Sequence, residues 1–496
     1  MRQRACGVRT LAAIATAVAV LVSAEAASAQ TPGAPVLPIL GDPLATSVAP
    51  FEGTTATPNP IRMTAPPQNP FMAPNGRSNI HDDAYMTDTY RVSGPLGDGP
   101  EISSLFAREC ASVTFDSQGR IVTICVGLDR PVLALLDPHT LQTLAAMPLP
   151  IRNLTSGSNP FTDFSGGGYF YLDDQDRAVL PTNDRHILVV AETPGPGFAV
   201  SRDYDLSGVV PSDDGIESAL PDWSGRLWFV SRQGIVGTVD RSTGAIHSMQ
   251  LPGEGISNSF AVDETGGVYI VSDKALYRFD ADAAGAPVVS WREVYPNSGI
   301  HKPGQSDAGS GTTPTLMGKN WVAITDNADP MDVVVYKRGL GVGGSRLVCS
   351  APVFQKGASA TDQSLNATDR SIVVENNYGY TGPAATLHGG VTAPGLTRVD
   401  VVSGHCRTIW TSQERAPSVV PKISLGNGLV YTYTKPQRSD GVDAWYLTAL
   451  DFRTGRTVYR RLAGTGFGYN NHYAPVSIAP DGVAYVGVLG GIVELP

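Results

Sequence analysis

The sequence predicts an all-β protein, a β-propeller of four-stranded blades. Two observations carry this prediction. One strand–turn–strand pattern recurs eight times between about residue 110 and the C-terminus, and no helical periodicity of any length follows the N-terminal apolar run. Four-stranded units with a period of about 40 to 55 residues are typical of a propeller. Because the repeats fill this whole region, we expect them to form one domain.

Residues 1–29 read as a secretory signal peptide. Arg2 and Arg4 precede the apolar stretch LAAIATAVAVLV, and the small residues ASA before Gln30 suit cleavage after Ala29. The apolar stretch is too short for a membrane span, which needs roughly 20 residues. We therefore expect a secreted or periplasmic mature chain with no membrane span. A retained signal anchor is the alternative.

Residues 30–78 form a leader rich in Pro, Ala and Thr, as in TPNPIRMTAPPQNPFMAPNG. Such a segment has little to bury, and its prolines lack the N–H groups that a sheet needs. We interpret it as an extended leader that is either disordered or laid over the main domain. The propeller is predicted to occupy residues 79–496, with ordered structure beginning between Ile80 and Tyr90.

The first recurring piece is an apolar strand, a tight polar turn and a second apolar strand, as in VTFDSQGRIVTI and FAVDETGGVYIV. Its eight copies begin near residues 112, 170, 219, 260, 314, 365, 422 and 477. A second piece, such as TVDRSTGAIHSM, follows by some 10 to 25 residues and places Asp before a turn and a strand. Each unit thus supplies four strands. The repeats predict eight blades, with seven as the alternative if one unit is irregular.

The last unit is short, and the chain ends at Pro496 after three strands. A propeller closes by taking the missing strand from the other end of the chain. We therefore expect an N-terminal strand to complete the last blade, and TDTYRVSGPL (residues 87–96) is the predicted donor.

Four cysteines remain after export, namely Cys110, Cys125, Cys349 and Cys406. An even number in an oxidising compartment favours two disulfides, for which three pairings exist. Cys110 and Cys125 lie symmetrically about the turn DSQG, so they face each other in an antiparallel hairpin. This favours a Cys110–Cys125 bridge and leaves Cys349 for Cys406. Four free buried thiols are the alternative.

The net charge of −10 argues against binding to nucleic acid. Contacts with a phosphate backbone need clustered Lys and Arg, and the sequence holds no basic run beyond YRR at residues 459–461. An acidic surface suits an exported protein and favours cations over anions.

Polar side chains follow two strands of consecutive repeats, in AITDNADPMDVVVY and SIVVENNYGY. Aligned on their tight turns, the two clusters come from neighbouring blades and meet at one rim of the central channel. Grouped carboxylate and amide oxygens are the ligands that Ca²⁺ prefers. The candidate metal ligands are Asp326, Asn327, Asp329, Glu375 and Asn376. The alternative is that these side chains cap strands and turns.

This arrangement of repeats resembles the eight-bladed quinoprotein-dehydrogenase-like propellers and the gluconolactonase-like, or senescence-marker-protein-like, propellers. The second resemblance implies a central divalent cation, Ca²⁺ or another, held by Glu, Asn and Asp. The first implies pyrroloquinoline quinone, but the adjacent cysteines of the quinone-binding alcohol dehydrogenases are absent from this sequence. Fold alone does not give function.

Histidines and tyrosines that precede inner strands are the candidate catalytic groups. GIHKPGQSDAG contains His301 and GYNNHYAPVSI contains His472 and Tyr473, and a His beside a Tyr can move protons. Surface or packing roles are the alternative. The residues predicted to bind substrate are Asn377, Tyr378, Asn471 and Lys302. His81, beside two aspartates in NIHDDAYMTD, is a further candidate that the sequence does not place relative to the channel.

These features predict an exported enzyme that acts on a small or sugar-like molecule at the mouth of the channel. The expected chemistry is hydrolysis or elimination assisted by a metal. A non-catalytic propeller that binds a glycan or a protein is the alternative, and a quinone-dependent oxidoreductase is a third. An enzyme should gather polar residues in a narrow pocket, whereas a binding propeller should expose an apolar or aromatic patch.

Overall fold

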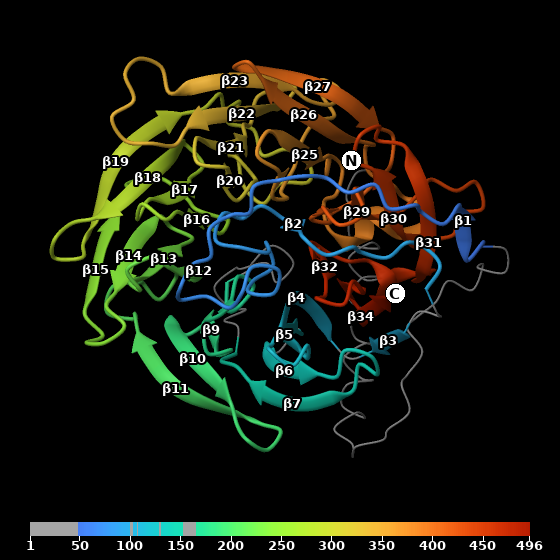
Figure 1. Ribbon diagram of the computed structural model, residues 1–496. Helices are drawn as coiled ribbons and strands as arrows, with labels where there is room; N and C mark the ends of the chain where they lie inside the picture. Colours follow the sequence, from blue (N-terminus) through green and yellow to red (C-terminus); the bar gives the residue numbers. More distant parts are fainter. Residues whose placement is uncertain (1–47, 100–102, 107, 128–129, 152–164) are drawn as a thin grey trace, which may run out of the picture.

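The computed structural model describes residues 48–99, 103–106, 108–127, 130–151 and 165–496. The predicted signal peptide lies outside these residues. The described strands form eight sheets arranged in a ring, which confirms the eight-bladed propeller (Figure 1). No helix in the described part of the chain is long and apolar enough to cross a membrane.

The first four blades follow one another along the chain, and each forms its own sheet. Blade 1 contains β4 (Glu109–Phe115), β5 (Ile121–Val126), β6 (Val132–Leu136) and β7 (Thr143–Pro148). Blade 2 contains β8 (Tyr171–Leu172), β9 (Ala178–Pro181), β10 (His186–Glu192) and β11 (Phe198–Asp205). Blade 3 contains β12 (Ile216–Pro221), β13 (Leu227–Ser231), β14 (Ile235–Val239) and β15 (Ile246–Gln250). Blade 4 contains β16 (Ala261–Val262), β17 (Val268–Val271), β18 (Ala275–Ala281) and β19 (Pro287–Val294).

The other four blades complete the ring. Blade 5 contains β20 (Thr315–Met317), β21 (Trp321–Thr325), β22 (Asp332–Lys337) and β23 (Leu347–Pro352). Blade 6 contains β24 (Asn366–Ala367), β25 (Ser371–Glu375), β26 (Leu396–Val402) and β27 (His405–Ser412). Blade 7 contains β28 (Lys422–Ser424), β29 (Leu429–Thr434), β30 (Ala444–Asp451) and β31 (Thr457–Thr465). Blade 8 contains β32 (Val476–Ile478), β33 (Ala484–Val488) and β34 (Gly491–Leu495). Among the described residues, two 3₁₀ helices, η2 (Pro383–Gly389) and η3 (Phe467–Tyr469), lie in loops.

The burial pattern follows the position of each strand in its blade. The inner strands β12 and β13 are buried at every position, because both faces of a blade pack against neighbouring blades. The outermost strand β19 alternates between buried and exposed residues, because only one of its faces is covered. The core therefore lies between the blades and runs around the ring.

The predicted tight turns are made by an Asp at the end of each of four inner strands. Its Oδ1 atom accepts hydrogen bonds from the backbone N–H groups two and four residues later, at 2.8–3.0 Å. The four residues are Asp116, Asp173, Asp222 and Asp263. The side chain thus replaces part of the backbone turn, which explains why the same residue recurs at this point of the repeat.

An N-terminal strand closes the ring, but it is not the predicted one. β3 (Ser103–Phe106) pairs antiparallel with β34 as the outer strand of blade 8. It leads directly into the inner strand of blade 1, as the outer strand of every other blade leads to its neighbour. Within the predicted donor, residues 87–96, β2 (Thr89–Tyr90) instead pairs parallel with the inner strand β28. That segment was misassigned because it lies at the centre of the ring, where outer strands do not lie.

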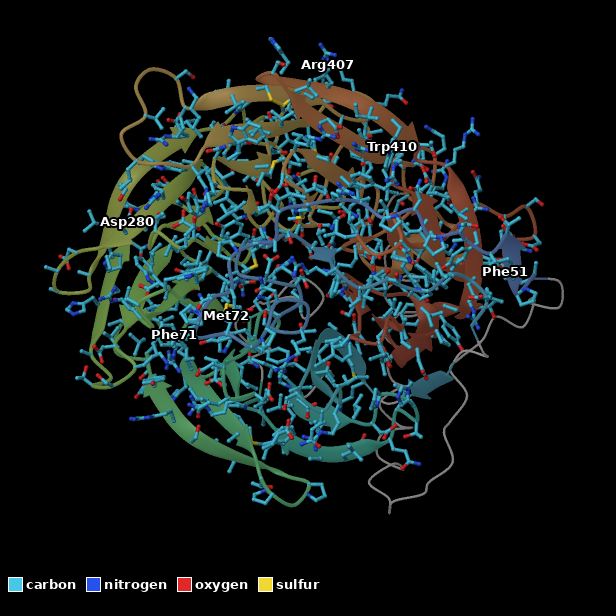
Figure 2. The ribbon with its side chains drawn as sticks, viewed as in Figure 1. Phe51, Phe71, Met72, Asp280, Arg407 and Trp410 are labelled. Carbon is cyan, nitrogen blue, oxygen red and sulfur yellow. A yellow bond between two sulfur atoms is a disulfide. The ribbon has the colours of Figure 1, made fainter. Side chains whose placement is uncertain are left out.

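The described part of the leader lies over the propeller, which is the second of the two expected arrangements. β1 (Phe51–Gly53) pairs with β31 and extends blade 7 at the periphery. Phe71 and Met72 lie closer to the centre of the ring (Figure 2). Asn69 Nδ2 donates a hydrogen bond of 2.8 Å to the carbonyl oxygen of Pro221. Ordered structure therefore begins well before Ile80.

Residues 77–90, which we call the channel segment, follow the inside of the ring (Figure 1). Backbone N–H groups near the ends of the inner strands donate to its carbonyl oxygens in blade order. The pairs are Phe115–Arg77, Leu172–Ser78, Val262–Ala84, Leu316–Tyr85, Ala367–Thr87 and Ile423–Asp88, at 2.7–3.3 Å. The segment therefore covers the end of the channel at which the inner strands finish.

Both predicted disulfides are present. The Cys110–Cys125 bridge joins directly paired residues of β4 and β5. The Cys349–Cys406 bridge joins β23 to β27, the outer strands of blades 5 and 6. The first bridge therefore lies within one hairpin, and the second fastens neighbouring blades together.

Candidate site in the central channel

A cavity of about 70 Å³ lies at the centre of the ring. Its walls come from residues at or just before the starts of the inner strands, and its remaining lining, Ile80 and His81, comes from the channel segment. The polar and aromatic wall residues include Ser112, Tyr169, Asn258, Asp362, Gln363, His472 and Tyr473. Because the channel segment covers the other end of these strands, the cavity faces the rim at which the inner strands begin.

His81 directs one ring nitrogen to a carboxylate and leaves the other without a partner. Its Nδ1 atom lies 3.0 Å from Asp88 Oδ2 and 3.2 Å from Asp88 Oδ1, whereas Nε2 has no hydrogen-bond partner although the residue is only 2% exposed. When Nδ1–H donates to Asp88, the neutral imidazole keeps a lone pair on Nε2. In this tautomer, His81 presents an oriented proton acceptor in the lining of the cavity.

Lys422 holds the other side of the Asp88 carboxylate. Its ammonium pairs with Asp88 and donates to the carbonyl oxygen of Ile80, and both side chains are fully buried. The lysine lies on β28, so the ion pair also fastens the channel segment to blade 7. Its charge offsets that of Asp88, so the carboxylate can orient His81 without leaving a net charge behind it.

Aromatic side chains surround the histidines. The rings of His81 and Tyr169 stack with centroids 6.0 Å apart, and the Tyr169 hydroxyl donates to Asn258 Oδ1 at 3.3 Å. His472 Nδ1 lies 2.9 Å from the Tyr380 hydroxyl, and its ring meets that of Tyr473 edge-on at 5.1 Å. These contacts fix the orientation of both imidazoles.

Five of the eleven described non-glycine residues with positive φ lie in the cavity lining or in the channel segment. His472 and Tyr473 have φ values of 36° and 71°, and Asp82, Met86 and Asp88 in the channel segment have φ values of 78°, 57° and 53°. Non-glycine residues in this region cost on the order of 1–3 kcal/mol each and tend to occur at functional sites. The surrounding contacts hold these residues in place against that cost.

Asp362 places a carboxyl group in the wall. Burial, together with the nearby charge of Asp307, raises the pKa of Asp362 to about 7. Its carboxylate accepts hydrogen bonds of 3.2 Å from the backbone N–H and the hydroxyl of Ser306. A carboxyl group with this pKa exchanges protons near neutral pH.

The structure brings two of the three predicted catalytic residues to this cavity. His472 and Tyr473 belong to its lining. His301 lies outside the lining, is exposed, and contacts the carbonyl oxygen of Gln305 through Nε2.

None of the four predicted substrate-binding residues lines the cavity. Lys302 is buried and donates to the carbonyl oxygens of Ala328 and Ser359. Asn471 Nδ2 donates to the carbonyl oxygen of Ala474, and Tyr378 is half-buried. Asn377 supports the wall from behind, because its Oδ1 accepts a hydrogen bond of 2.9 Å from the backbone N–H of Asp362. These assignments stay predictions.

The donor set predicted for a metal makes mostly internal contacts. Asp326 Oδ1 accepts from the N–H groups of Ala328 and Asp332, and the exposed Asp329 accepts from the N–H of Gly357. Both amide atoms of Asn376 are hydrogen-bonded, and Asn327 Nδ2 donates to Asn297 Oδ1 and the carbonyl oxygen of Ile300.

Free oxygens do remain in this set, on Asp326 Oδ2, Asn327 Oδ1 and Glu375 Oε2. However, no group of three or more His, Cys, Asp or Glu residues that could hold a metal occurs in the described ranges. The ammonium of Lys302 already supplies positive charge near Asp326 and Asp329. These contacts fit capping better than a cage of six to eight oxygens, and the divalent cation stays a prediction.

Sequence reasoning missed Tyr169, Asn258, Asp362 and the role of Asp88. A signal for three of them was present, because Tyr169, Asn258 and Asp362 all lie two to four residues before an inner strand. Aligning the repeats on the positions just before their first strand, instead of on the exits of the second strand, would have gathered them. Asp88 had no such signal, because its role depends on the path of the channel segment.

Two larger grooves lie elsewhere. One of about 510 Å³, between blades 2 and 3, contains Arg177, Arg202, Arg226 and Arg241. Another of about 430 Å³ lies between the leader and the propeller and contains Asp82 and Asp83. Both have a larger volume than the central cavity, but neither gathers residues from around the whole ring. The central cavity also holds the oriented histidine, so we take it as the candidate site.

Comparison with known proteins leaves both the family and the activity of the chain open. No family model matches the chain. An uncharacterized protein of Archaeoglobus fulgidus is 29% identical over 340 residues, which are 61% of this chain and 65% of that protein. The chain thus spans less than two thirds of this relative.

Solved structures with similar backbones have low sequence identity to the chain. BamB from Moraxella catarrhalis is 14% identical, with a TM-score of 0.40, over 65% of this chain and 96% of BamB. A streptogramin B lyase is 9% identical, with a TM-score of 0.39, over 79% of this chain and 96% of the lyase. The computationally designed protein Ika8 is 15% identical, with a TM-score of 0.47, over 80% of this chain and 99% of Ika8. The expected propeller fold is confirmed by the ring of eight sheets in the structure itself.

Proposed function

We propose that this chain is an exported enzyme that carries out hydrolysis or elimination on a small or sugar-like molecule in the central cavity. The observation that carries the proposal is the arrangement of His81, whose Nδ1 contacts Asp88 while Nε2 has no partner. The two disulfides support export, because such bridges persist in oxidising compartments. The cavity of about 70 Å³ limits the reacting group to a few non-hydrogen atoms.

His81 acts as the general base and Asp362 as the general acid in this proposal. In an elimination, Nε2 takes a proton from carbon, the bond from the neighbouring carbon to the leaving oxygen breaks, and protonated Asp362 gives that oxygen a proton. In a hydrolysis, Nε2 takes the proton from an attacking water instead. A carboxyl group with a pKa of about 7 is partly protonated at neutral pH, as this role requires. No step needs the predicted divalent cation.

The test is a substrate screen with a matched pair of variants. The mature protein is assayed on esters, lactones and glycosides, with acid release reporting hydrolysis and ultraviolet absorbance of a new conjugated double bond reporting elimination. In His81→Asn the amide can still donate to Asp88, but the acceptor at Nε2 is lost. We expect kcat to fall by about 10²–10⁴-fold, whereas His405→Asn, an exposed position on β27, leaves it unchanged. Full activity in a folded His81→Asn protein would exclude His81 as the base.

A binding propeller is the second candidate function, and the groove between blades 2 and 3 favours it. The guanidinium of Arg202 has no ion pair or hydrogen bond among the described residues, and that of Arg241 lies over the ring of Phe71 at 5.5 Å. Such a surface suits an anionic glycan or protein segment. Absence of turnover in the screen, together with retention on an anionic glycan column that Arg202→Gln abolishes, would favour this function over the enzyme.

A further inference from the structure

We infer that the molecule bound in the central cavity carries a positively charged amine. This inference rests on the site of the proposed function and names the chemical class of its ligand. Three features of the lining carry it: the sign of its charge, its aromatic side chains and its excess of hydrogen-bond acceptors.

The charge of the lining is acidic. Asp362 is the carboxylate of the wall, and no lysine or arginine lies among the described residues that line the cavity. Lys422 is a buried cation beside the lining, and its ammonium is held by Asp88 and the carbonyl oxygen of Ile80. An anionic ligand would therefore meet a carboxylate and find no basic partner, at a cost of several kcal/mol for such like-charge contacts.

The hydroxyl of Tyr169, another residue of the lining, also lies in a negative electrostatic potential. Burial raises the pKa of the Tyr169 hydroxyl, and the negative charges of Glu217, Asp362 and Asp88 add to that effect. Because Lys422 offsets the charge of Asp88, the effect on this point of the lining comes chiefly from Glu217 and Asp362. A cation in the cavity is therefore favoured over an anion.

The aromatic side chains suit a cation as well. Tyr169 and Tyr473 line the cavity together with the imidazoles of His81 and His472. The faces of aromatic rings attract ammonium groups, and small sites lined by rings and a carboxylate are typical for amines. A sugar hydroxyl or a neutral ester gains nothing comparable from this charge and these rings.

The hydrogen-bonding groups call for a donor. His81 Nε2 has no partner, and the Asp362 carboxylate accepts only from Ser306 in the contacts that the structure shows. A primary ammonium group brings three donors, which suits a lining of acceptors such as the Asp362 carboxylate. A ligand without donors would leave a buried acceptor unsatisfied.

The test compares three small probes of similar size that differ in charge: ethanolamine, ethylene glycol and glycolate. Binding to the mature protein is measured by titration calorimetry and by the shift in melting temperature, at neutral pH. We expect ethanolamine to bind at least tenfold more tightly than ethylene glycol and glycolate. Tighter binding of glycolate, or equal binding of all three probes, overturns the inference.

Two variants locate the bound probe. In Asp362→Asn the amide oxygen can still accept the hydrogen bonds from Ser306. The substitution therefore preserves the local structure of the cavity wall and removes the negative charge. We expect its affinity for ethanolamine to fall at least tenfold, whereas Asp174→Asn, an exposed site in the distant groove, should leave it unchanged. Unchanged affinity in Asp362→Asn would place the probe elsewhere and overturn the inference.

This binding test is independent of turnover. If glycolate binds more tightly and the reaction depends on His81, the inference of an amine ligand is overturned while the proposed enzymatic function is kept. If ethanolamine binding depends on Asp362 and His81→Asn is fully active, the inference of an amine ligand is kept and His81 is excluded as the base.

Discussion

The ammonium of Lys422 and the carboxylate of Asp88 form an ion pair in which both side chains are fully buried. The two residues are more than three hundred positions apart in the chain. Their contact joins the channel segment to the inner strand of blade 7, and the same carboxylate orients His81. The stability of the fold and the geometry of the candidate site therefore depend on one carboxyl group.

Asp88→Asn should be strongly destabilising. The substitution leaves the Lys422 charge buried without its partner, which typically costs about 3–5 kcal/mol. We expect the free energy of unfolding, measured by urea denaturation, to fall by about that amount. The amide also accepts less strongly from His81, so any activity of the remaining folded protein should decrease.

The double variant Asp88→Asn, Lys422→Met is the matched control. It removes both charges, and replacing a buried ion pair with uncharged side chains is often close to neutral. We expect it to recover most of the stability that Asp88→Asn loses. If the single variant costs less than about 1 kcal/mol, or the double variant is no more stable than the single one, the pair does not hold the channel segment as argued.

The two disulfides should differ in what they contribute. Cys110 and Cys125 are 15 residues apart, whereas Cys349 and Cys406 are 57 residues apart. In the chain-entropy description these loops correspond to about 3 and about 4 kcal/mol respectively. We therefore expect the Cys349→Ser, Cys406→Ser variant to lower the free energy of unfolding by more than Cys110→Ser, Cys125→Ser does.

Urea denaturation of both variants beside the oxidised wild type measures this difference. Reduction of the wild type without denaturant is the control, because it breaks whichever bridges the solvent reaches without altering the sequence. A larger loss on removing Cys110–Cys125 would show that the hairpin bridge acts through packing in the native state instead of through chain entropy.

The repeat structure was predictable because it is local. The expected repeat starts near residues 170, 260 and 422 lie within one residue of β8, β16 and β28, since each inner strand ends in an Asp, Gly or Asn turn that its own sequence encodes. The Cys110–Cys125 bridge followed from the same hairpin symmetry. Blade number and disulfide pairing therefore needed no long-range information.

The channel segment was not predictable from its sequence. Its carbonyl oxygens accept from the inner strands, and any backbone can make such bonds, so no side-chain pattern marks them. For the same reason the closing strand was misplaced, and His81 had no known position. The rim amides such as Asn376 and Asn377 were found, but their hydrogen bonds show that much of such a cluster serves the fold.

Asp326 makes stability depend on pH. Burial raises the pKa of Asp326 to about 7 from an ordinary value of 3.8, so the folded state binds more protons than the unfolded state between these values. Its contribution is therefore fully present below about pH 4 and is lost as the pH rises toward 7. In Asp326→Asn the Oδ1 contacts to Ala328 and Asp332 can remain, and no buried charge develops.

We expect Asp326→Asn to match the wild type near pH 4 and to be more stable by up to about 4 kcal/mol at pH 8. Urea denaturation across this pH range measures the difference in the free energy of unfolding between the two proteins. The other carboxyl groups that titrate in this range contribute equally to both proteins, so their contributions cancel in the difference. If the free energy of unfolding depends on pH in the same way in both proteins, burial does not raise the pKa of Asp326 as expected.

The Asp326→Asn variant also tests the predicted divalent cation site. If Asp326 and Glu375 hold Ca²⁺, adding it at pH 8 should stabilise the wild type and reverse the order, with Asp326→Asn becoming the less stable protein. The capping contacts and the nearby Lys302 ammonium instead predict that Ca²⁺ and chelator leave both curves in place. Metal analysis of both purified proteins distinguishes the two cases. A divalent ion that is bound to the wild type and lost in Asp326→Asn would support the predicted cation site. No bound divalent ion in either protein would support a capping role for Asp326.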